Sequence, residues 1–186
     1  STDHLFENIG MTDKGHPFYQ NVSEKAGVLI EGYGLGLAIS DLNLDGWPDI
    51  YVANDFIASD LLYINNQEGT FTNQLATYTQ HSSRNGMGVD IADLNGDALP
   101  DILVMDMLPE SNRRQKTMTA DMNFEHFKRT LGEGFAPQFI KNSLQLHRGI
   151  GPDGKPHFSE VGRLANLHQT DWSWAPLIAD FDNDGL

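Results

Sequence analysis

A nine-residue acidic segment recurs along this chain and constrains its fold more than any other feature. The first copy, residues 41–49, reads DLNLDGWPD; the second, residues 93–101, reads DLNGDALPD; and the third, residues 180–186, reads DFDNDGL. Self-similarity of this kind is typical of repeat architectures. We therefore expect a fold built from similar structural units, each of which carries one acidic loop.

The spacing of the oxygen-bearing residues predicts a cation site in each copy. Oxygens at positions 1, 3, 5 and 9, with the main-chain carbonyl at position 7, can surround a hard cation such as Ca²⁺ with about six or seven ligands. The ligands predicted by this rule are Asp41, Asn43, Asp45, Trp47 (carbonyl) and Asp49 in the first copy, Asp93, Asn95, Asp97, Leu99 (carbonyl) and Asp101 in the second, and Asp180, Asp182 and Asp184 in the third. The sequence thus predicts up to three Ca²⁺ sites.

The second and third copies depart from the first. Gly46 follows the third ligand of the first copy and allows the sharp turn that wraps a chain around an ion. The second copy has Gly96 before its third ligand and Ala98 at the place of Gly46, and the third copy breaks off before position 9. The first site is therefore the best defined of the three.

Two other structures could carry such a segment. An EF-hand loop begins in the same way, but it needs a Glu at position 12 and a helix on each side. Position 12 here is Val52 or Val104, inside a β-branched, apolar run that predicts a strand. The other alternative is a solvated Asp/Asn turn without metal, which repetition at matching places disfavours.

A longer repeat surrounds the loops and predicts propeller blades. Phe71 lies 53 residues after Phe18, and Phe158 lies 87 residues after Phe71, so the second unit carries an insertion of about 34 residues. Each unit reads as four short antiparallel strands with the acidic loop between the first two, which is the pattern of a propeller blade. The fold class is therefore all-β: a β-propeller fragment of about three four-stranded blades, with a helical insertion in the second full blade.

The expected boundaries follow from these landmarks. Residues 1–17 end a preceding blade, residues 18–70 and 71–157 are repeat units with the insertion at about 106–141, and residues 158–186 start the next, truncated unit. We expect Gly34, Gly36, Gly86 and Gly88 to let neighbouring inner strands approach closely. We expect five aromatic residues to lie in the core: Phe18, Tyr51, Tyr63, Phe71 and Phe158. Trp172 and Trp174 point to the same face, and we expect them to pack between blades, with a ligand-stacking platform as the alternative.

The insertion is the most individual part of the chain. A basic cluster, Arg113, Arg114 and Lys116, is followed by apolar residues near helical spacing, which predict a helix over residues 117–131 with Gly132 or Gly134 at its end. Thr119 or Asp121 would cap this helix. The insertion is either a flap packed on the rim or a surface that binds a partner or ligand, and its cations are expected to pair with Asp residues of the protein itself.

Several segments resemble a known family. They are residues 32–37, 41–55, 103–110, 142–147 and 170–174. These segments are similar to FG-GAP/VCBS-type repeats, the integrin-α-like calcium-binding propeller, and within it to the ASPIC/UnbV-associated, cartilage-acidic-protein-like type. The resemblance implies Ca²⁺ in the loops, seven blades in the parent, and an extracellular protein or a lipoprotein of the bacterial outer-membrane surface; it implies no reaction. Gly34 lacks a preceding Phe-Gly, and no ASPIC/UnbV segment is present.

Composition excludes several functions. With 26 acidic and 12 basic residues, the net charge is −14, which argues against nucleic acid as a partner. The sequence contains no apolar run of about 18 residues, so it predicts no membrane span. It contains no cysteine, which excludes disulfides and thiolate metal sites. The seven histidines show no zinc-site spacing, and neither a nucleophile elbow nor a phosphate-binding loop occurs.

The sequence therefore favours a binding function over a catalytic one. We expect a non-catalytic, Ca²⁺-stabilised propeller that acts as a binding or assembly module for a protein or glycan at the cell surface, for instance in an outer-membrane complex. The alternative is the scaffold of an extracellular enzyme, such as a carbohydrate-active one, whose catalytic residues lie mostly outside these 186 residues.

Overall fold

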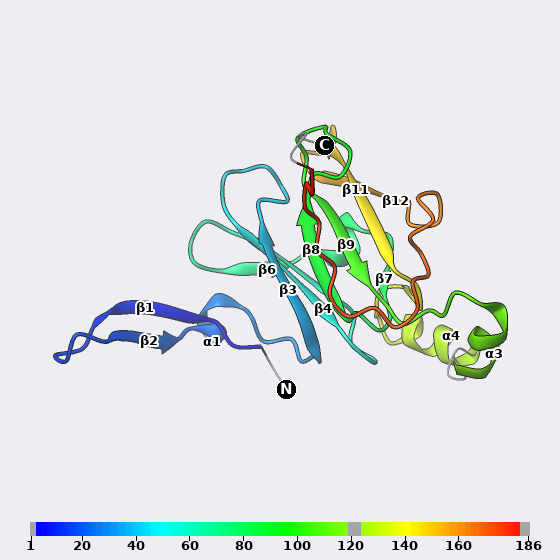
Figure 1. The fold of residues 1–186 in the computed structure, drawn as a ribbon. Coiled ribbons are helices and arrows are strands. Elements are labelled where there is room, and N and C mark those ends of the chain that lie inside the picture. Colours follow the sequence, from blue (N-terminus) through cyan, green and yellow to red (C-terminus); the bar gives the residue numbers. More distant parts are fainter. Residues whose placement is uncertain (1–2, 119–123, 183–186) are drawn as a thin grey trace.

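Two four-stranded antiparallel sheets form the body of the protein (Figure 1). The computed structural model describes residues 3–118 and 124–182. The first sheet, blade 1, contains β3 (Gly34–Ser40), β4 (Asp49–Asn54), β5 (Leu61–Asn65) and β6 (Phe71–Asn73), and the second, blade 2, contains β8 (Gly88–Ala92), β9 (Asp101–Met105), β11 (Ser143–Ile150) and β12 (Pro156–Glu160). In each blade the strands pair in chain order. The fold is all-β and is built from propeller blades, as the repeat predicts.

Smaller elements flank the blades. They are a hairpin of β1 (Phe6–Met11) and β2 (Pro17–Asn21), a parallel pair of β7 (Ser82–Ser83) and β10 (Gln138–Phe139), and the helices α1 (Ser23–Ala26), α2 (Leu75–Tyr78), α3 (Asn112–Met118) and α4 (Phe124–Gly132). In Figure 1 the hairpin extends away from the blades on one side, and α3 and α4 lie on the other. No helix of the described ranges is long and apolar enough to cross a membrane.

The inner strands of the two blades lie very close together, which accounts for their small residues. A Cβ atom on Gly36 of β3 would lie 2.7 Å from the Cα atom of Gly88 in β8. Gly88 itself faces the main-chain oxygen of Trp174 and the ring of Pro176, which belong to the segment beside β8. The backbones can approach in this way only because these positions carry no side chain.

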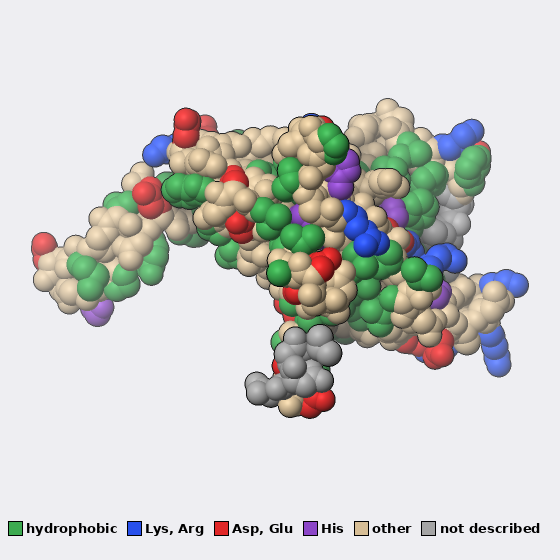
Figure 2. All heavy atoms as spheres, turned by 90° about the horizontal axis from the view of Figure 1, so that it is seen from above, with side chains coloured by type: hydrophobic (Ala, Val, Ile, Leu, Met, Phe, Trp, Pro, Cys, Tyr) green, Lys and Arg blue, Asp and Glu red, His purple; other side chains and the backbone are tan. Residues whose placement is uncertain are grey.

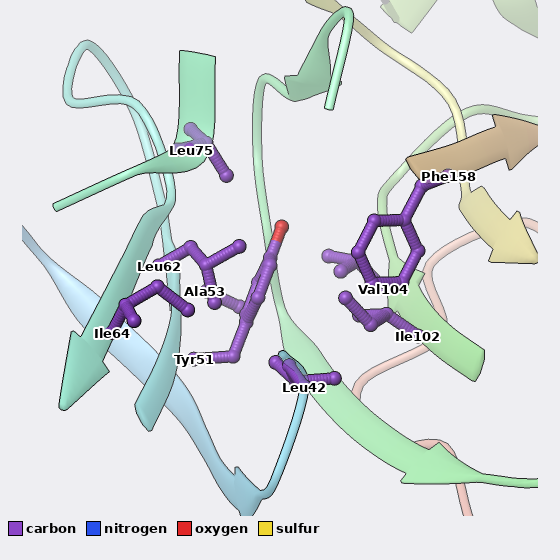
Figure 3. Packing of buried hydrophobic residues seen from close by; sticks show 9 residues of the cluster. All are labelled: Leu42, Tyr51, Ala53, Leu62, Ile64, Leu75, Ile102, Val104 and Phe158. Carbon is purple, nitrogen blue, oxygen red and sulfur yellow. The ribbon is translucent and has the colours of Figure 1, made fainter. Parts of the chain in front are cut away.

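The main hydrophobic core fills the space between the blades (Figure 3). Tyr51 and Ala53 of β4 point toward blade 2, where they meet Ile102 and Val104 of β9. Val52, between them, points to the opposite face and packs in a second cluster with residues from α1 and β5. Alternate residues of a strand face opposite sides of a sheet, and β4 is therefore buried on both.

Some of the aromatic predictions are wrong. Tyr51, Tyr63 and Phe158 are buried as predicted, but Phe18 is 54% exposed, because the described β1–β2 hairpin pairs with no third strand. Trp172 and Trp174 are also more than half exposed. They lie in a segment that forms no regular strand, so the predicted packing of both side chains between blades is not found.

The insertion contains two helices in place of the single one predicted. The basic cluster lies on α3, which sequence patterning did not predict, and α4 ends at Gly132 as predicted. The proposed cap residues Thr119 and Asp121 lie outside the described residues. The insertion rejoins the blades through β10, which pairs in parallel with β7.

Candidate metal centre

The two complete acidic loops occupy equivalent places in the two blades. Loop 1 (residues 41–49) joins β3 to β4, and loop 2 (residues 93–101) joins β8 to β9. Both therefore lie at the same end of the sheets, and the insertion emerges at the opposite end (Figure 1). The fold brings each loop's predicted ligands into one short turn.

Loop 1 is organised by the side chains of its predicted ligands. The carboxylate of Asp41 accepts hydrogen bonds from the main-chain N–H groups of Asp45 (3.0 Å) and Gly46 (2.8 Å). Asn43 accepts a further bond from the Asp45 N–H (3.1 Å), and Asp45 accepts one from the N–H of Trp47 (2.9 Å). These bonds to the backbone hold the turn in one conformation.

Loop 2 repeats this arrangement position for position. Asp93 accepts bonds from the N–H groups of Asp97 (3.2 Å) and Ala98 (2.7 Å), Asn95 from that of Asp97 (3.1 Å), and Asp97 from that of Leu99 (3.0 Å). In both loops the Asn side chain also donates to the following Asp at 2.9 Å. The two loops therefore share this set of bonds, to which loop 2 adds bonds from the N–H groups of Asn95 (3.3 Å) and Gly96 (2.8 Å) to Asp93.

The displaced glycine of loop 2 does not alter that structure. Loop 1 has left-handed φ angles at Leu44 (59°) and Gly46 (88°), and loop 2 has them at Gly96 (75°) and Ala98 (64°). These are positions 4 and 6 of each loop. Each copy thus places glycine at one of two left-handed positions and accepts a side chain at the other, and the departure noted in the sequence leaves the turn intact.

The last Asp of each loop fastens it to the blade. Asp49 is fully buried and accepts hydrogen bonds from the N–H groups of Leu42 (2.9 Å) and Asn65 (2.8 Å), the latter at the end of β5. Asp101 likewise accepts hydrogen bonds from the N–H group of Leu94 (3.0 Å) and from that of His147 in β11 (2.8 Å). Position 9 therefore has a structural task whether or not a cation is bound.

The loops supply the carboxylate and amide oxygens that hard cations prefer, but these side chains are not gathered around one point. No ion pair of the described residues involves a carboxylate of loop 1 or loop 2, so the negative charges of each loop lack a cationic partner. Equally, no three His, Cys, Asp or Glu side chains of these residues converge on a common centre. Asp45 is instead held by Asn43 and by Gln67 (3.0 Å), bonds that a cation would have to replace.

The local environment acts on the pKa values of the predicted ligands. Burial raises the pKa of Asp49 above its ordinary value, and this outweighs the bonds from Asn65 and Leu42. Burial also acts to raise the pKa of Asp45, but hydrogen bonds from Gln67, Trp47 and Asn43 outweigh it and lower that pKa. For Asp93, the bonds from its loop's N–H groups likewise outweigh desolvation and lower the pKa. Asp45 and Asp93 are thus favoured as anions, the form that binds a cation.

The third copy is only partly described. Asp180 and Asp182 are exposed in the segment that follows Trp174 along β8, and Asp184 lies outside the described residues. The roles of the Trp47 and Leu99 carbonyls remain predictions, because only the N–H groups of these residues take part in the loop bonds.

A second set of buried polar residues, at the other end of the strands, was missed by sequence reasoning. In blade 1 the N–H of Asn54 donates to Asp60 (2.9 Å), and in blade 2 the N–H of Asp106 donates to Asn142 (2.7 Å). All four are nearly or fully inaccessible to solvent. The repeat alignment contained the signal, because positions 54 and 106 are each five residues beyond the last Asp of a loop.

The two buried carboxylates of this set influence each other. Burial, with the nearby charge of Asp106, raises the pKa of Asp60 to about 7, although Asp60 accepts hydrogen bonds from Asn54 and the hydroxyl of Tyr51. Burial also raises the pKa of Asp106, which accepts bonds from the Ser83 hydroxyl and the N–H of Asn85. This region is therefore sensitive to protonation.

A shallow hollow of about 300 Å³ lies between the blades at their outer edge. Its lining comes from α2 and from the β11–β12 turn and includes Tyr78, Lys155 and the His157–Asp153 pair (3.0 Å). Burial raises the pKa of Tyr78, and the charges of Asp49 and Asp45 raise it further. Tyr78, and with it the hollow, therefore lies near loop 1.

The α3 helix of the insertion carries a basic cluster on an acidic protein. Viewed from the loop end, Lys and Arg side chains gather on the side where the insertion lies (Figure 2). Arg114 pairs with Asp171, so the predicted pairing with the protein's own Asp is confirmed for this residue. Arg113 and Lys116 are exposed, as are the apolar side chains of Phe124 and Leu131.

Residues 41–104 match the FG-GAP-like repeat family. The match extends from the first ligand of loop 1 to the end of β9 and covers about a third of the chain. It confirms the resemblance to FG-GAP repeats for this part of the protein. No curated protein matches the chain.

Proposed function

We propose that this protein is a non-catalytic, Ca²⁺-stabilised β-propeller module that binds another macromolecule at the cell surface. The FG-GAP-like match indicates a binding-type propeller of a kind typical of extracellular proteins. The observation that carries the calcium proposal is the equivalence of loops 1 and 2. Seven hydrogen bonds recur position for position in two sequences that place their glycine differently.

In this proposal Ca²⁺ stabilises the fold and takes no part in a reaction. Asp41, Asn43, Asp45 and Asp49 would hold it in loop 1, and Asp93, Asn95, Asp97 and Asp101 in loop 2. When bound, the ion offsets the unpaired carboxylate charge of each loop. At a free Ca²⁺ concentration ten times Kd, one site contributes about 1.4 kcal/mol to the free energy of unfolding.

The test is calorimetric titration with Ca²⁺ and thermal unfolding with and without chelator. We expect saturable binding and a higher Tm in Ca²⁺, and both effects should decrease when Asp41→Asn and Asp45→Asn remove the charges of the half-buried Asp41 and the exposed Asp45. Asp49 is left unchanged because it is needed by the fold itself. The control is Asp13→Asn, an exposed carboxylate in the β1–β2 turn. Equal Tm values in Ca²⁺ and chelator would contradict the proposal.

The insertion is the proposed partner-binding surface. Its exposed cations, Arg113 and Lys116, and the exposed apolar side chains of α4 belong to the same insertion, a combination that suits an acidic protein or glycan surface. We expect a stoichiometric partner to copurify with the full protein from native membranes and to be found by mass spectrometry. Arg113→Glu with Lys116→Glu should remove it, whereas Lys14→Glu in the β1–β2 hairpin should not. Copurification unaffected by the insertion variant would place the partner elsewhere.

The enzyme alternative gains no support from the described residues. The hollow beside loop 1 contains His157 and Asp153, but both side chains are more than half exposed and pair with each other. Groups in such surroundings lack the desolvation that tunes a catalytic residue.

A further inference from the structure

The connection between the two blades is held by one buried carboxylate from each of them. Asp60 precedes β5 in blade 1, Asp106 follows β9 in blade 2, and both are fully buried. Asp60 accepts a hydrogen bond from the main-chain N–H of Ser83. Asp106 accepts one from the hydroxyl of the same serine and two more, at 3.1 Å each, from the N–H groups of the next two residues. Residues 82–85, the seam segment, are therefore bonded to both blades.

The seam segment also receives the end of the insertion. Its first two residues form β7, which pairs in parallel with β10. Its N–H groups donate to the carbonyl oxygens of Pro137 (3.0 Å) and Phe139 (3.1 Å). The side chain of Gln138 donates to the hydroxyl of Ser59 (2.9 Å), in the connection that leads to β5. The insertion thus returns to the blades on a segment whose own position depends on two buried carboxylates.

This attachment can open without the sheets. The β7 and β10 strands have two residues each, whereas the strands beside the insertion pair within their own blades. The apolar contact at the attachment is the ring of Phe139, which lies 5.1 Å from the ring of His81 and 5.7 Å from that of Phe127 and is 37% exposed. Elements with few buried apolar contacts are the ones that open locally.

The two carboxylates oppose each other while the attachment is closed. No ion pair of the described ranges includes either of them. Burial and the charge of Asp106 raise the pKa of Asp60 to about 7, and burial raises the pKa of Asp106. Lifting the seam segment admits water, which returns the pKa of Asp60 toward 3.8. The closed form therefore binds a proton that the open form releases, and it becomes less favoured as pH rises from about 4 to 7.

The other titratable groups at this place do not produce that trend. The hydroxyl of Tyr51 donates to Asp60 at 2.9 Å, and burial raises the pKa of Tyr51 well above its ordinary value, so the hydroxyl keeps its proton. Burial and the nearby Lys141 lower the pKa of His81, which favours the closed form as pH rises and so has the opposite sign. The remaining charged groups named by the contacts are Glu160, which binds Lys141 and lies 3.7 Å from His81, Asp55, which accepts from the Asn85 side chain, and Arg84.

We propose that Asp60 and Asp106 form a proton-operated latch, which holds the end of the insertion against the blades at acidic pH and loosens it toward neutral pH. The latch depends neither on the proposed calcium sites nor on the proposed partner. The start of the insertion stays attached when the latch opens, because Arg114 of α3 pairs with Asp171 and Gln115 donates to Gln169 (3.1 Å). Proton release therefore frees one end of the insertion and leaves the other fixed.

The test is native-state hydrogen exchange of the whole chain at pH 5, 6 and 7, with rates corrected for the intrinsic effect of pH. The protection factors of the amides in residues 82–85 should fall by about tenfold or more between pH 5 and pH 7. Low concentrations of urea should hardly change them, since local opening exposes little surface. The amides of β4 and β9, which need global unfolding, should be better protected and should respond to urea.

Matched variants identify the group that titrates. Asp60→Asn gives blade 1 the residue type that blade 2 has at Asn142, and the pH effect should shrink to less than about twofold. Asp106→Asn removes the charge that raises the pKa of Asp60 and should move the effect to lower pH. His81→Gln should leave the effect in place, as should Asp13→Asn in the β1–β2 turn. Circular dichroism confirms that each variant is folded, and Asp106→Asn alone still tests the latch if Asp60→Asn is not.

Three results would overturn the latch. If residues 82–85 show the same protection and the same urea dependence as β4 and β9, the attachment has no separate opening. Protection factors that stay constant from pH 5 to pH 7 would show that protons do not control it. A pH effect that survives unchanged in Asp60→Asn, or in Asp106→Asn, would assign it to a different group.

Discussion

Blade 1 and blade 2 make the same polar contacts at both ends of their strands, but they distribute glycine and charge differently. At the loop end, glycine occupies position 6 in blade 1 and position 4 in blade 2. At the other end, blade 1 has Asn54 above Asp60, and blade 2 has Asp106 above Asn142. The two blades therefore repeat the same pattern of hydrogen bonds to the backbone, and different residue types make these bonds in each blade.

The strongest test of this equivalence is removal of the last Asp of each loop. Asp49→Ala and Asp101→Ala should each lower the free energy of unfolding by roughly 2 to 5 kcal/mol, because each leaves one buried and one partly buried main-chain N–H without its partner, at up to about 3 kcal/mol apiece. The measurement is urea denaturation in chelator, which excludes a contribution from Ca²⁺. Asp13→Asn is the control. A large difference between the two variants would show that the blades are not equivalent.

The exchanged Asp and Asn residues place the larger pH dependence at Asp60 of blade 1, for which the raised pKa has a value. The pKa of Asp60 is about 7 in the folded protein, against an ordinary value of 3.8. Between these values the folded state holds a proton that the unfolded state has lost, so the free energy of unfolding decreases as pH rises from about 4 to 7. The full effect is at most about 4 kcal/mol.

Asp60→Asn gives blade 1 the residue of blade 2 and should flatten this part of the profile. Urea denaturation at pH 5 and pH 8 gives the change in the free energy of unfolding between the two pH values for the variant and for the original protein. The difference between these two changes cancels the contribution of Asp49 and contains that of Asp60 together with its interaction with Asp106. If the free energy of unfolding changes between pH 5 and pH 8 by the same amount in Asp60→Asn as in the original protein, another group titrates in this range.

The smallest expected effect comes from the two left-handed positions of the loops. Ala98→Gly should stabilise the protein by about 0.5 to 1 kcal/mol, and Gly46→Ala should destabilise it by a similar amount, because a Cβ atom disfavours left-handed φ angles. Leu44→Gly combined with Gly46→Ala converts loop 1 to the pattern of loop 2 and should be nearly neutral. Thermal unfolding in chelator checks all three, and a strongly destabilised double variant would contradict the interchange.

Sequence reasoning succeeded where a contact is local. The nine-residue loops and the strands after them depend on short-range spacing, so β4 and β9 were predicted correctly. It failed where burial depends on a distant element. The residues around Phe18 do not reveal that its strand, β2, pairs only with β1 among the described residues. The residues around His147 do not reveal that its ring reaches the carbonyl of Leu42, 105 residues away.

The insertion shows the same division. Its apolar spacing predicted a helix, and α4 fulfils that prediction. The α3 helix was missed because its sequence, NRRQKTM, is almost entirely polar and has no apolar stripe to reveal a buried face. Asp60 and Asp106 belong to different blades and lie far apart in sequence, so no local pattern indicates that the charge of one acts on the other.

The place where the insertion enters blade 2 makes it a natural site for exchanging modules. The second and third strands of a blade are joined by six residues, 55–60, in blade 1 and by 37 residues, 106–142, in blade 2. Yet the strands on either side pair in both blades, with Ser143 opposite Val104 and Leu61 opposite Val52. The sheet is thus indifferent to what its outward connection carries, and a foreign binding segment grafted between α3 and β10 would be displayed without disturbing the loops at the far end.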